Sequence, residues 1–214
     1  MADDLKYGYK GAEPTQSFGN NTGVFDPNDI NNLIADNKWT TFGQLELIET
    51  QTVTPSVSTV DFIDIKQDIY NVHFLTYNNV QAISDGPTLR IQFYESGVLE
   101  VGSVYDYAVQ YGNGVGAFGE LRSTTATNIL FGSNIGGSTS ESGQGYVYFY
   151  NLGDNTKYSF TTMHTISLNA DPNALFYFGS AVLHQASTVD GIRLFLDSGN
   201  IDTGTFSLYG IRYL

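Results

Sequence analysis

The sequence predicts an all-β protein, an antiparallel two-sheet sandwich of the jelly-roll type, with an N-terminal extended arm and one short helix. From Gly43 onward, apolar and polar residues alternate with the period of two that is typical of strands. Roughly ten such segments, rich in β-branched and aromatic residues, are separated by turns of Gly, Asn, Asp and Ser. Only one segment has helical spacing, so βαβ units cannot form and antiparallel pairing follows. We expect two packed sheets, with a single closed barrel as the second architecture.

The composition favours a protein that packs against other proteins. Hydrophobic residues make up 41% of the 214 residues and aromatic residues 14%, which is enough for a sizeable core. Charged residues make up only 14%, well below the usual value of about 25%. A surface that is low in charge and rich in Tyr and Asn suits permanent contact with protein better than it suits a free monomer.

Charge and missing residue types argue against several functions. The net charge is −13 and the nine Lys and Arg are scattered, so we expect no nucleic-acid partner. The chain has no cysteine, which excludes disulfides, Cys-ligated zinc, iron–sulfur clusters and a Cys nucleophile. The opening MADDLKYGYK lacks the basic and apolar regions of a signal peptide. No run approaches the about 18 apolar residues of a membrane span, so we expect no membrane partner.

The helix signal lies in residues 26–38, DPNDINNLIADNK. Asp26 can cap the helix, and Pro27 stands at its first position. Ile30, Leu33 and Ile34 form one apolar stripe. The helix is short, so it needs packing against something else to persist.

Residues 1–24 have no period, yet they carry more aromatic side chains than a purely disordered tail. We interpret them as an extended arm rather than a flexible terminus, and Trp39 as a pin between the helix and the body. The expected domains are therefore an anchoring arm and helix over 1–42 and a β-sandwich over 43–214. The expected anchor residues are Tyr7, Tyr9, Phe18, Val24, Phe25, Ile30, Leu33, Ile34 and Trp39.

The strand segments follow in order. They are QLELIETQTV (44–53), STVDFIDI (58–65), IYNVHFLTYNN (69–79), PTLRIQFYE (87–95), VYDYAVQY (104–111), NILFG (128–132), GYVYFYNLG (145–153), KYSFTTMHTISLN (157–169), LFYFGSAVLHQ (175–185), DGIRLFLDS (190–198) and GTFSLYGIRYL (204–214). The last two are expected to form a terminal hairpin that seals the C-terminal strand into a sheet. Within 157–169, one face is shared by Tyr158, Phe160, Thr162, His164, Ile166 and Leu168.

No motif predicts catalysis, so we expect no catalytic residue, no cofactor, no metal and no enzyme. His73, His164 and His184 lie in strand patterns, where a packed or cross-strand role is the ordinary one. Residues 197–202, DSGNID, could offer oxygens to calcium, but they lack the full loop pattern and are better read as a β-turn.

Two Gly-rich stretches, GNGVGAFGE (112–120) and GGSTSESGQG (136–145), are expected to be loops, the second exposed at a tip. Residues in or next to these loops that could touch a ligand are Tyr111, Asn113, Ser138 and Ser140.

A series of strand tyrosines has two interpretations. Such rings can serve as platforms for a sugar, or they can form a sheet face that a neighbour buries. The sequence leaves both open for Tyr105, Tyr107, Tyr111, Tyr146, Tyr148 and Tyr150.

Three stretches carry a resemblance that frames nearly the whole chain. They are SFGNNTGVFDPNDINNLIADNKW (17–39), GQLELIETQTV (43–53) and GTFSLYGI (204–211). The chain resembles virion structural proteins of tailed bacteriophages, especially phages of marine bacteria and cyanobacteria. The resemblance implies a structural role in the virion, assembled in the host bacterial cytoplasm, and no catalytic residues.

The resemblance leaves the position on the particle open. The first expectation is capsid decoration or stabilisation, with the major capsid protein or tail proteins as partners. The alternative is a tail fibre or tail adaptor protein whose sandwich binds a host receptor or glycan. In either position we expect a homo-oligomer, with a trimer as the favoured state.

Overall fold

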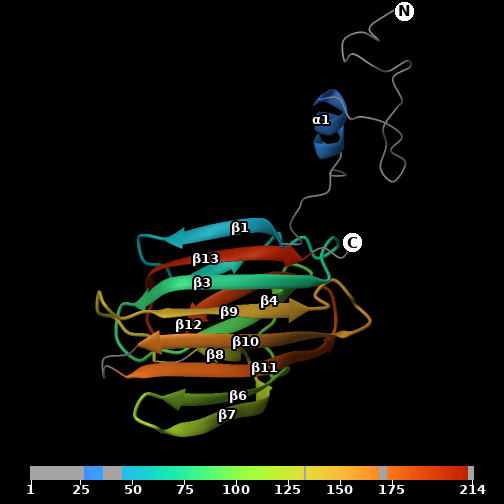
Figure 1. Ribbon diagram of the computed structural model, residues 1–214. Coiled ribbons are helices and arrows are strands. Elements are labelled where there is room, and N and C mark those ends of the chain that lie inside the picture. Colours follow the sequence, from blue (N-terminus) through green and yellow to red (C-terminus); the bar gives the residue numbers. More distant parts are fainter. Residues whose placement is uncertain (1–26, 36–44, 133, 169–172, 212–214) are drawn as a thin grey trace, which may run out of the picture. The chain divides into compact units, whose positions relative to one another are not determined.

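The computed structural model describes residues 27–35, 45–132, 134–168 and 173–211 (Figure 1). The chain divides into two units, residues 1–43 and 44–214. The described part of the first unit is one helix, α1 (Pro27–Ala35), and the described part of the second forms thirteen strands. The Asp26 cap and residues 36–38 of the predicted helix lie outside the described residues.

Eight strands form the larger sheet, sheet A, in the antiparallel order β1-β13-β3-β9-β10-β11-β6-β7. Five strands form the smaller sheet, sheet B, in which β12 lies between β2 and β4, and β5 and β8 pair with different ends of β4. The bounds in sheet A are β1 (Leu45–Val53), β3 (Val72–Ala82), β6 (Tyr105–Asn113), β7 (Phe118–Ala126), β9 (Gly143–Tyr150), β10 (Tyr158–Leu168), β11 (Ala174–Ala186) and β13 (Ile201–Ile211). The bounds in sheet B are β2 (Thr59–Phe62), β4 (Leu89–Glu95), β5 (Val98–Leu99), β8 (Ile129–Gly132) and β12 (Val189–Leu196).

The pairing confirms the predicted two-sheet sandwich and its jelly-roll character. Eight of the strands pair from the outside of the chain inward: β1 with β13, β2 with β12, β3 with β9, and β4 with β8. This is a long antiparallel hairpin wound into two sheets, which is the jelly-roll arrangement. The pairs β10–β11 and β6–β7 are additions that extend sheet A beyond β9.

The core lies between the two sheets. On β3 Leu75 and Tyr77 are buried, and on β4 Ile91 and Phe93 are buried. Phe93 of sheet B meets Phe149 of sheet A edge to face, with ring centroids 5.9 Å apart. Such contacts between rings of the two sheets fix how the sheets pack.

The predicted terminal hairpin is wrong. Strand β12 lies in sheet B, and β13 lies in sheet A between β1 and β3 (Figure 1). The connection at 197–200 therefore crosses between sheets. The expectation that the last strand is sealed into a sheet is confirmed, because β13 has a neighbour on each side.

Both Gly-rich stretches contain more strand than the sequence suggested. GNGVGAFGE is the tight connection between β6 and β7, where Gly116 takes a φ of +88°. The strand β7 that follows was not predicted. In the second stretch the loop ends at Ser142, because Gly143 begins β9. Its backbone is tied to β3, since the Gln81 side chain donates to the carbonyls of Ser138 and Glu141 at 2.8 Å each.

Candidate functional site

Strand β10 has its apolar side facing out of the sandwich and its polar side facing in. The outward series holds Phe160, which is 46% exposed, and Ile166, which is 51% exposed. The inward series is almost wholly polar, and all of it is buried: Ser159, Thr161, Met163, Thr165 and Ser167. A solvated sheet face shows the opposite arrangement. The outer side of β10 is therefore a candidate binding surface.

Aromatic rings continue this side of sheet A on the strands β3, β9 and β13. The Phe74 ring lies 4.6 Å from the Tyr148 ring, 5.9 Å from the Tyr146 ring and 6.1 Å from the Tyr209 ring. Tyr148 in turn stacks on Tyr150 at 6.4 Å. These five rings form one cluster, and they come from three neighbouring strands, which lie side by side in Figure 1.

A second cluster lies on the other side of β10. Phe178, 46% exposed, stands opposite His164 of β10 in the strand register, and Phe176 stands opposite Ile166. The rings of Phe176 and Phe178 are stacked with centroids 6.2 Å apart. We call the outer side of β13, β3, β9, β10 and β11 the aromatic face.

The strands of the aromatic face carry almost no charge. Strands β3, β9, β10 and β11 contain no Asp, Glu, Lys or Arg, and β13 contains one, Asp202, near its beginning. The chain as a whole has a net charge of −13. Its acidic residues are therefore concentrated away from this face, which leaves a broad uncharged surface on an acidic protein.

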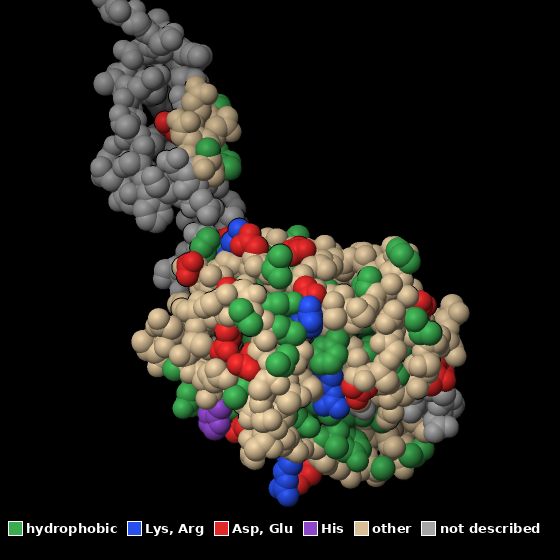
Figure 2. Space-filling model, turned by 180° about the vertical axis from the view of Figure 1, so that it is seen from behind, with side chains coloured by type: hydrophobic (Ala, Val, Ile, Leu, Met, Phe, Trp, Pro, Cys, Tyr) green, Lys and Arg blue, Asp and Glu red, His purple; other side chains and the backbone are tan. Residues whose placement is uncertain are grey.

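The outer side of sheet B differs in carrying charge, and Figure 2 shows acidic and basic side chains among hydrophobic ones on this side of the molecule. Arg193 donates to both carboxylate oxygens of Asp61, at 2.7 and 3.1 Å. Burial raises the pKa of Asp61, but hydrogen bonds from Arg193, Thr59 and Tyr94 outweigh it, so this pKa lies below its usual value. The Arg193 guanidinium also lies 5.4 Å from the Tyr94 ring centre. These contacts pair Asp61, Tyr94 and Arg193 with one another, whereas Arg90 Nε and Asp190 Oδ1 on the same sheet are buried without a partner among the described residues.

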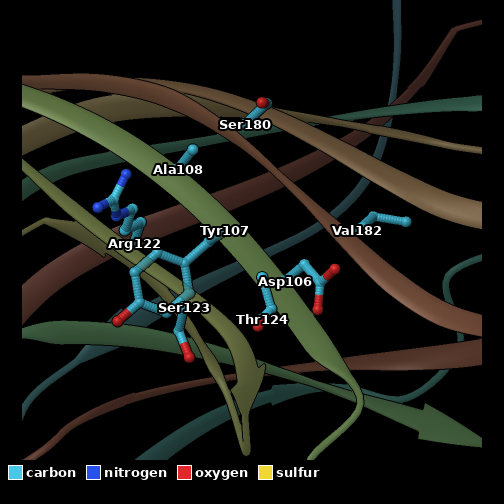
Figure 3. A pocket seen from close by; sticks show the side chains of 8 residues that line it. All are labelled: Asp106, Tyr107, Ala108, Arg122, Ser123, Thr124, Ser180 and Val182. Atoms are coloured by element: carbon cyan, nitrogen blue, oxygen red, sulfur yellow. The ribbon is translucent and has the colours of Figure 1, made fainter.

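A shallow hollow of about 510 Å³ borders the aromatic face at β11. Figure 3 shows its side chains, which come from β6, β7 and β11. They include the carboxylate of Asp106 and the guanidinium of Arg122, and the remainder are Tyr107, Ala108, Ser123, Thr124, Ser180 and Val182. His184, just outside, lies 3.3 Å from Asp106. The hollow offers polar groups to a ligand but no nucleophile paired with a base.

The three histidines have different surroundings. His73 is buried, its Nε2 lies 2.7 Å from the Ile65 carbonyl, and burial lowers its pKa to about 4. His164 lies on the aromatic face with its ring 5.8 Å from Tyr146, and His184 lies 5.0 Å from the Tyr158 ring. Within the described ranges no group of three His, Asp or Glu could hold a metal ion.

The structure divides the six strand tyrosines into two groups, one facing the core and one facing outward. Tyr105, Tyr107 and Tyr111 turn toward the core, and Tyr111 stacks on Tyr177 at 5.6 Å. The outward ones are Tyr146, Tyr148 and Tyr150.

The predicted loop residues lie in three different places. Tyr111 is part of β6. Asn113 closes the β6–β7 turn, because its side-chain oxygen accepts from the Ala117 backbone N–H at 2.9 Å. Ser138 and Ser140 lie in an exposed turn between β8 and β9. A ligand role for these four residues stays a prediction.

Most predicted anchor residues lie outside the described residues: Tyr7, Tyr9, Phe18, Val24, Phe25 and Trp39. Of the rest, Ile30 and Leu33 on α1 are partly exposed and Ile34 is 56% exposed, so no residue of this helix is buried. Among the described residues, no helix is long and apolar enough to cross a membrane.

The DSGNID stretch serves the fold. The Asp197 carboxylate accepts from the Thr88 backbone N–H at 2.9 Å and from Arg90 at 3.2 Å. Gly199 takes a φ of +70°, which a turn here requires and which glycine adopts without strain. These contacts account for Asp197 without a cation.

Comparison with known proteins gives no relative. No protein-family model, no curated protein and no solved structure matches this chain. The aromatic face therefore has to be interpreted from its own chemistry.

Proposed function

We propose that this protein is a non-enzymatic structural subunit of a tailed-bacteriophage particle, anchored by its N-terminal region and presenting the β-sandwich on the particle surface. The observation that carries the proposal is the inverted strand β10, with buried Ser and Thr on its inner side and exposed apolar side chains on its outer side. Such a strand fits a protein whose outer face is covered by other protein. The resemblance of residues 17–39, 43–53 and 204–211 to phage virion proteins supplies the kind of assembly.

Within the particle, we propose capsid decoration or stabilisation as the first position. The partners are then the major capsid protein and further copies of this chain. A wide, nearly uncharged face suits permanent contacts of this type, which are more apolar than transient ones. The chain's net charge of −13 disfavours contacts with nucleic acid during assembly.

The copy number per particle tests this position. We would measure it by quantitative mass spectrometry of purified particles against the major capsid protein. Copies on the order of hundreds per particle are expected for a decoration protein. About six to eighteen copies, as cyclic tail symmetries imply, would move the protein to the tail. Absence from the particle would refute a virion role altogether.

A second candidate is a tail fibre or adaptor protein that binds a glycan. It is favoured by Tyr146 and Phe178, which are 40% and 46% exposed and stand on either side of His164 in the register, one row from the hydroxyl groups of Thr162 and Ser180. Aromatic rings next to polar groups can stack on sugars. A glycan array with the wild-type protein and with Tyr146→Ala separates the two candidates. Binding that the substitution abolishes supports the fibre role, and no binding by the folded protein counts against it.

A further inference from the structure

We propose that the aromatic face of sheet A is the surface by which this chain binds a second copy of itself. The inference names a partner for this face, and it rests on the proposed function only in treating the protein as an assembly subunit. Four properties of the face support it: the inverted strand, the area, the lack of charge and the character of the hydroxyl groups.

The inverted strand shows that the outer side of β10 is built as a core side. Thr161 and Ser159 are fully buried, and their hydroxyl oxygens have no hydrogen-bond partner among the described residues. Burying such groups is unfavourable, whereas burying Phe160 and Ile166 in their place would be favourable. A monomeric chain would be more stable if the polar residues of β10 faced outward and the apolar residues faced the core. Exposed apolar residues on the outer side of β10 are no longer unfavourable when another protein surface covers that side.

The area of the face matches what an interface needs. Its five most exposed apolar side chains are Tyr146, Tyr158, Phe160, Ile166 and Phe178, with exposed fractions of 40 to 51%. If full burial covers about 150–250 Å² per large side chain, these five leave about 340–570 Å² open. That already reaches the size of the largest apolar patch on a typical monomer, about 300–600 Å². The half-buried rings between them bring the face toward the about 800 Å² per partner of a standard interface.

The charge distribution selects a second copy as the occupant. Two copies each carry a net charge of −13 and repel one another over most of their surfaces. The aromatic face is the place where they can meet without bringing carboxylates together, because four of its five strands contain no charged residue. A basic partner would instead be drawn to the acidic surfaces. An uncharged face gives a charged partner nothing to pair with.

The face is also complementary to itself. Rings and hydroxyl groups lie in neighbouring rows across β9, β10 and β11: one row holds Tyr146, His164 and Phe178, and the next holds Tyr148, Thr162 and Ser180. Tyr150 and Thr162 hydroxyls lie 3.3 Å apart, so these groups can donate as well as accept. When one face turns by a half rotation onto the same face of another copy, apolar rings meet rings, and each hydroxyl can find a donor or an acceptor. A symmetric dimer interface requires this kind of match.

The test uses the full-length chain and two isoleucines that form a matched pair. Ile166 on the aromatic face is 51% exposed, and Ile69, in the turn before β3, is 52% exposed. Ile166→Glu places a carboxylate within the proposed interface, and Ile69→Glu places the same charge outside it. Phe178→Ser is a second variant on the face. All are measured by light scattering coupled to size exclusion between about 1 and 100 μM, with circular dichroism to verify folding.

We expect the wild-type protein and Ile69→Glu to have at least twice the mass of one chain, and Ile166→Glu and Phe178→Ser to dissociate at least tenfold more readily. The mass of the wild type also decides between a dimer and the trimer expected from the sequence. A monomeric wild-type chain at 100 μM would overturn the proposal and point to a glycan or to the N-terminal arm as the occupant. Folded face variants that associate as tightly as Ile69→Glu would also overturn it. Either failure leaves incorporation into a particle untouched, because the assay uses the isolated protein.

Discussion

Thr161 on β10 offers a direct test of the inverted strand. Its side chain is fully buried, and its hydroxyl oxygen has no partner among the described residues. In the strand register it stands between Phe149 of β9 and Ala181 of β11, both of which are buried. The hydroxyl therefore lies in apolar surroundings. Thr161→Val replaces it with a methyl group of nearly the same shape, so no cavity forms.

The expected gain follows from the cost of an unsatisfied buried polar group, which is about 1–3 kcal/mol. We expect Thr161→Val to raise the free energy of unfolding by about 1–2 kcal/mol, since part of that cost is relieved by side-chain motion. The unfolding midpoint should rise by about 2–4 °C per kcal/mol for a protein of this size. The measurement is urea and thermal unfolding by circular dichroism at one fixed protein concentration, because association would shift the midpoint.

The control is Thr52→Val, on an exposed position of β1, for which we expect a change within about 0.5 kcal/mol. If Thr161→Val destabilises the protein, the hydroxyl has a partner such as an ordered water, and the reasoning about β10 fails at this position. If both variants stabilise equally, the gain comes from strand propensity and not from relief of a buried hydroxyl.

Three further predictions concern other parts of the sandwich. Burial lowers the pKa of His73 from 6.5 to about 4, so on acidification the unfolded chain binds a proton before the native chain does. The free energy of unfolding should therefore be highest above pH 6.5 and fall by up to about 3 kcal/mol as the pH drops toward 4. His73→Gln should flatten this part of the profile of stability against pH, measured by urea unfolding. Arg193→Ala should lower the free energy of unfolding by about 1 kcal/mol, because it removes a bidentate, partly buried ion pair. Arg122→Ala removes an ion pair whose arginine is 78% exposed, so it should lower stability by less than about 0.5 kcal/mol. Equal losses in thermal unfolding would contradict this difference. Gly179→Ala should lower the free energy of unfolding by about 1–3 kcal/mol, because a Cβ there would clash with the Ala108 carbonyl oxygen of the neighbouring strand β6. Gly114→Ala is the control: the nearest contact of its Cβ is at 3.9 Å, so its stability in the same assay should stay close to wild type.

Alternation along the chain was enough to find most strands and to group the residues that share a side. On β3 the period of two places His73, Leu75 and Tyr77 together, and all three are buried. On β4 the same pattern correctly selects Leu89, Ile91 and Phe93. On β4 the other side carries Arg90 and Gln92, so only one orientation buries the apolar series. On β3 the other side carries Phe74, so alternation alone does not decide which side is buried.

The connections and the extra strand could not be obtained in this way. The segments that became β12 and β13 are joined by a turn-like stretch that suits a hairpin as well as a crossing between sheets. Local residues do not decide between the two, because the choice depends on which partner strands are free elsewhere in the sandwich. Strand β7 was missed because its apolar residues are few and most of its side chains are exposed, so its pattern is weak.

The sequence by itself determined the fold class, the positions of most strands and the low charge of the chain. It also grouped Tyr158, Phe160 and Ile166 on one side of β10. Only the tertiary structure decided that this side faces outward, because periodicity separates two sides of a strand without saying which one meets the other sheet. That choice is made by the packing of sheet A on sheet B, and it turns a pattern that resembles a core into an exposed aromatic face.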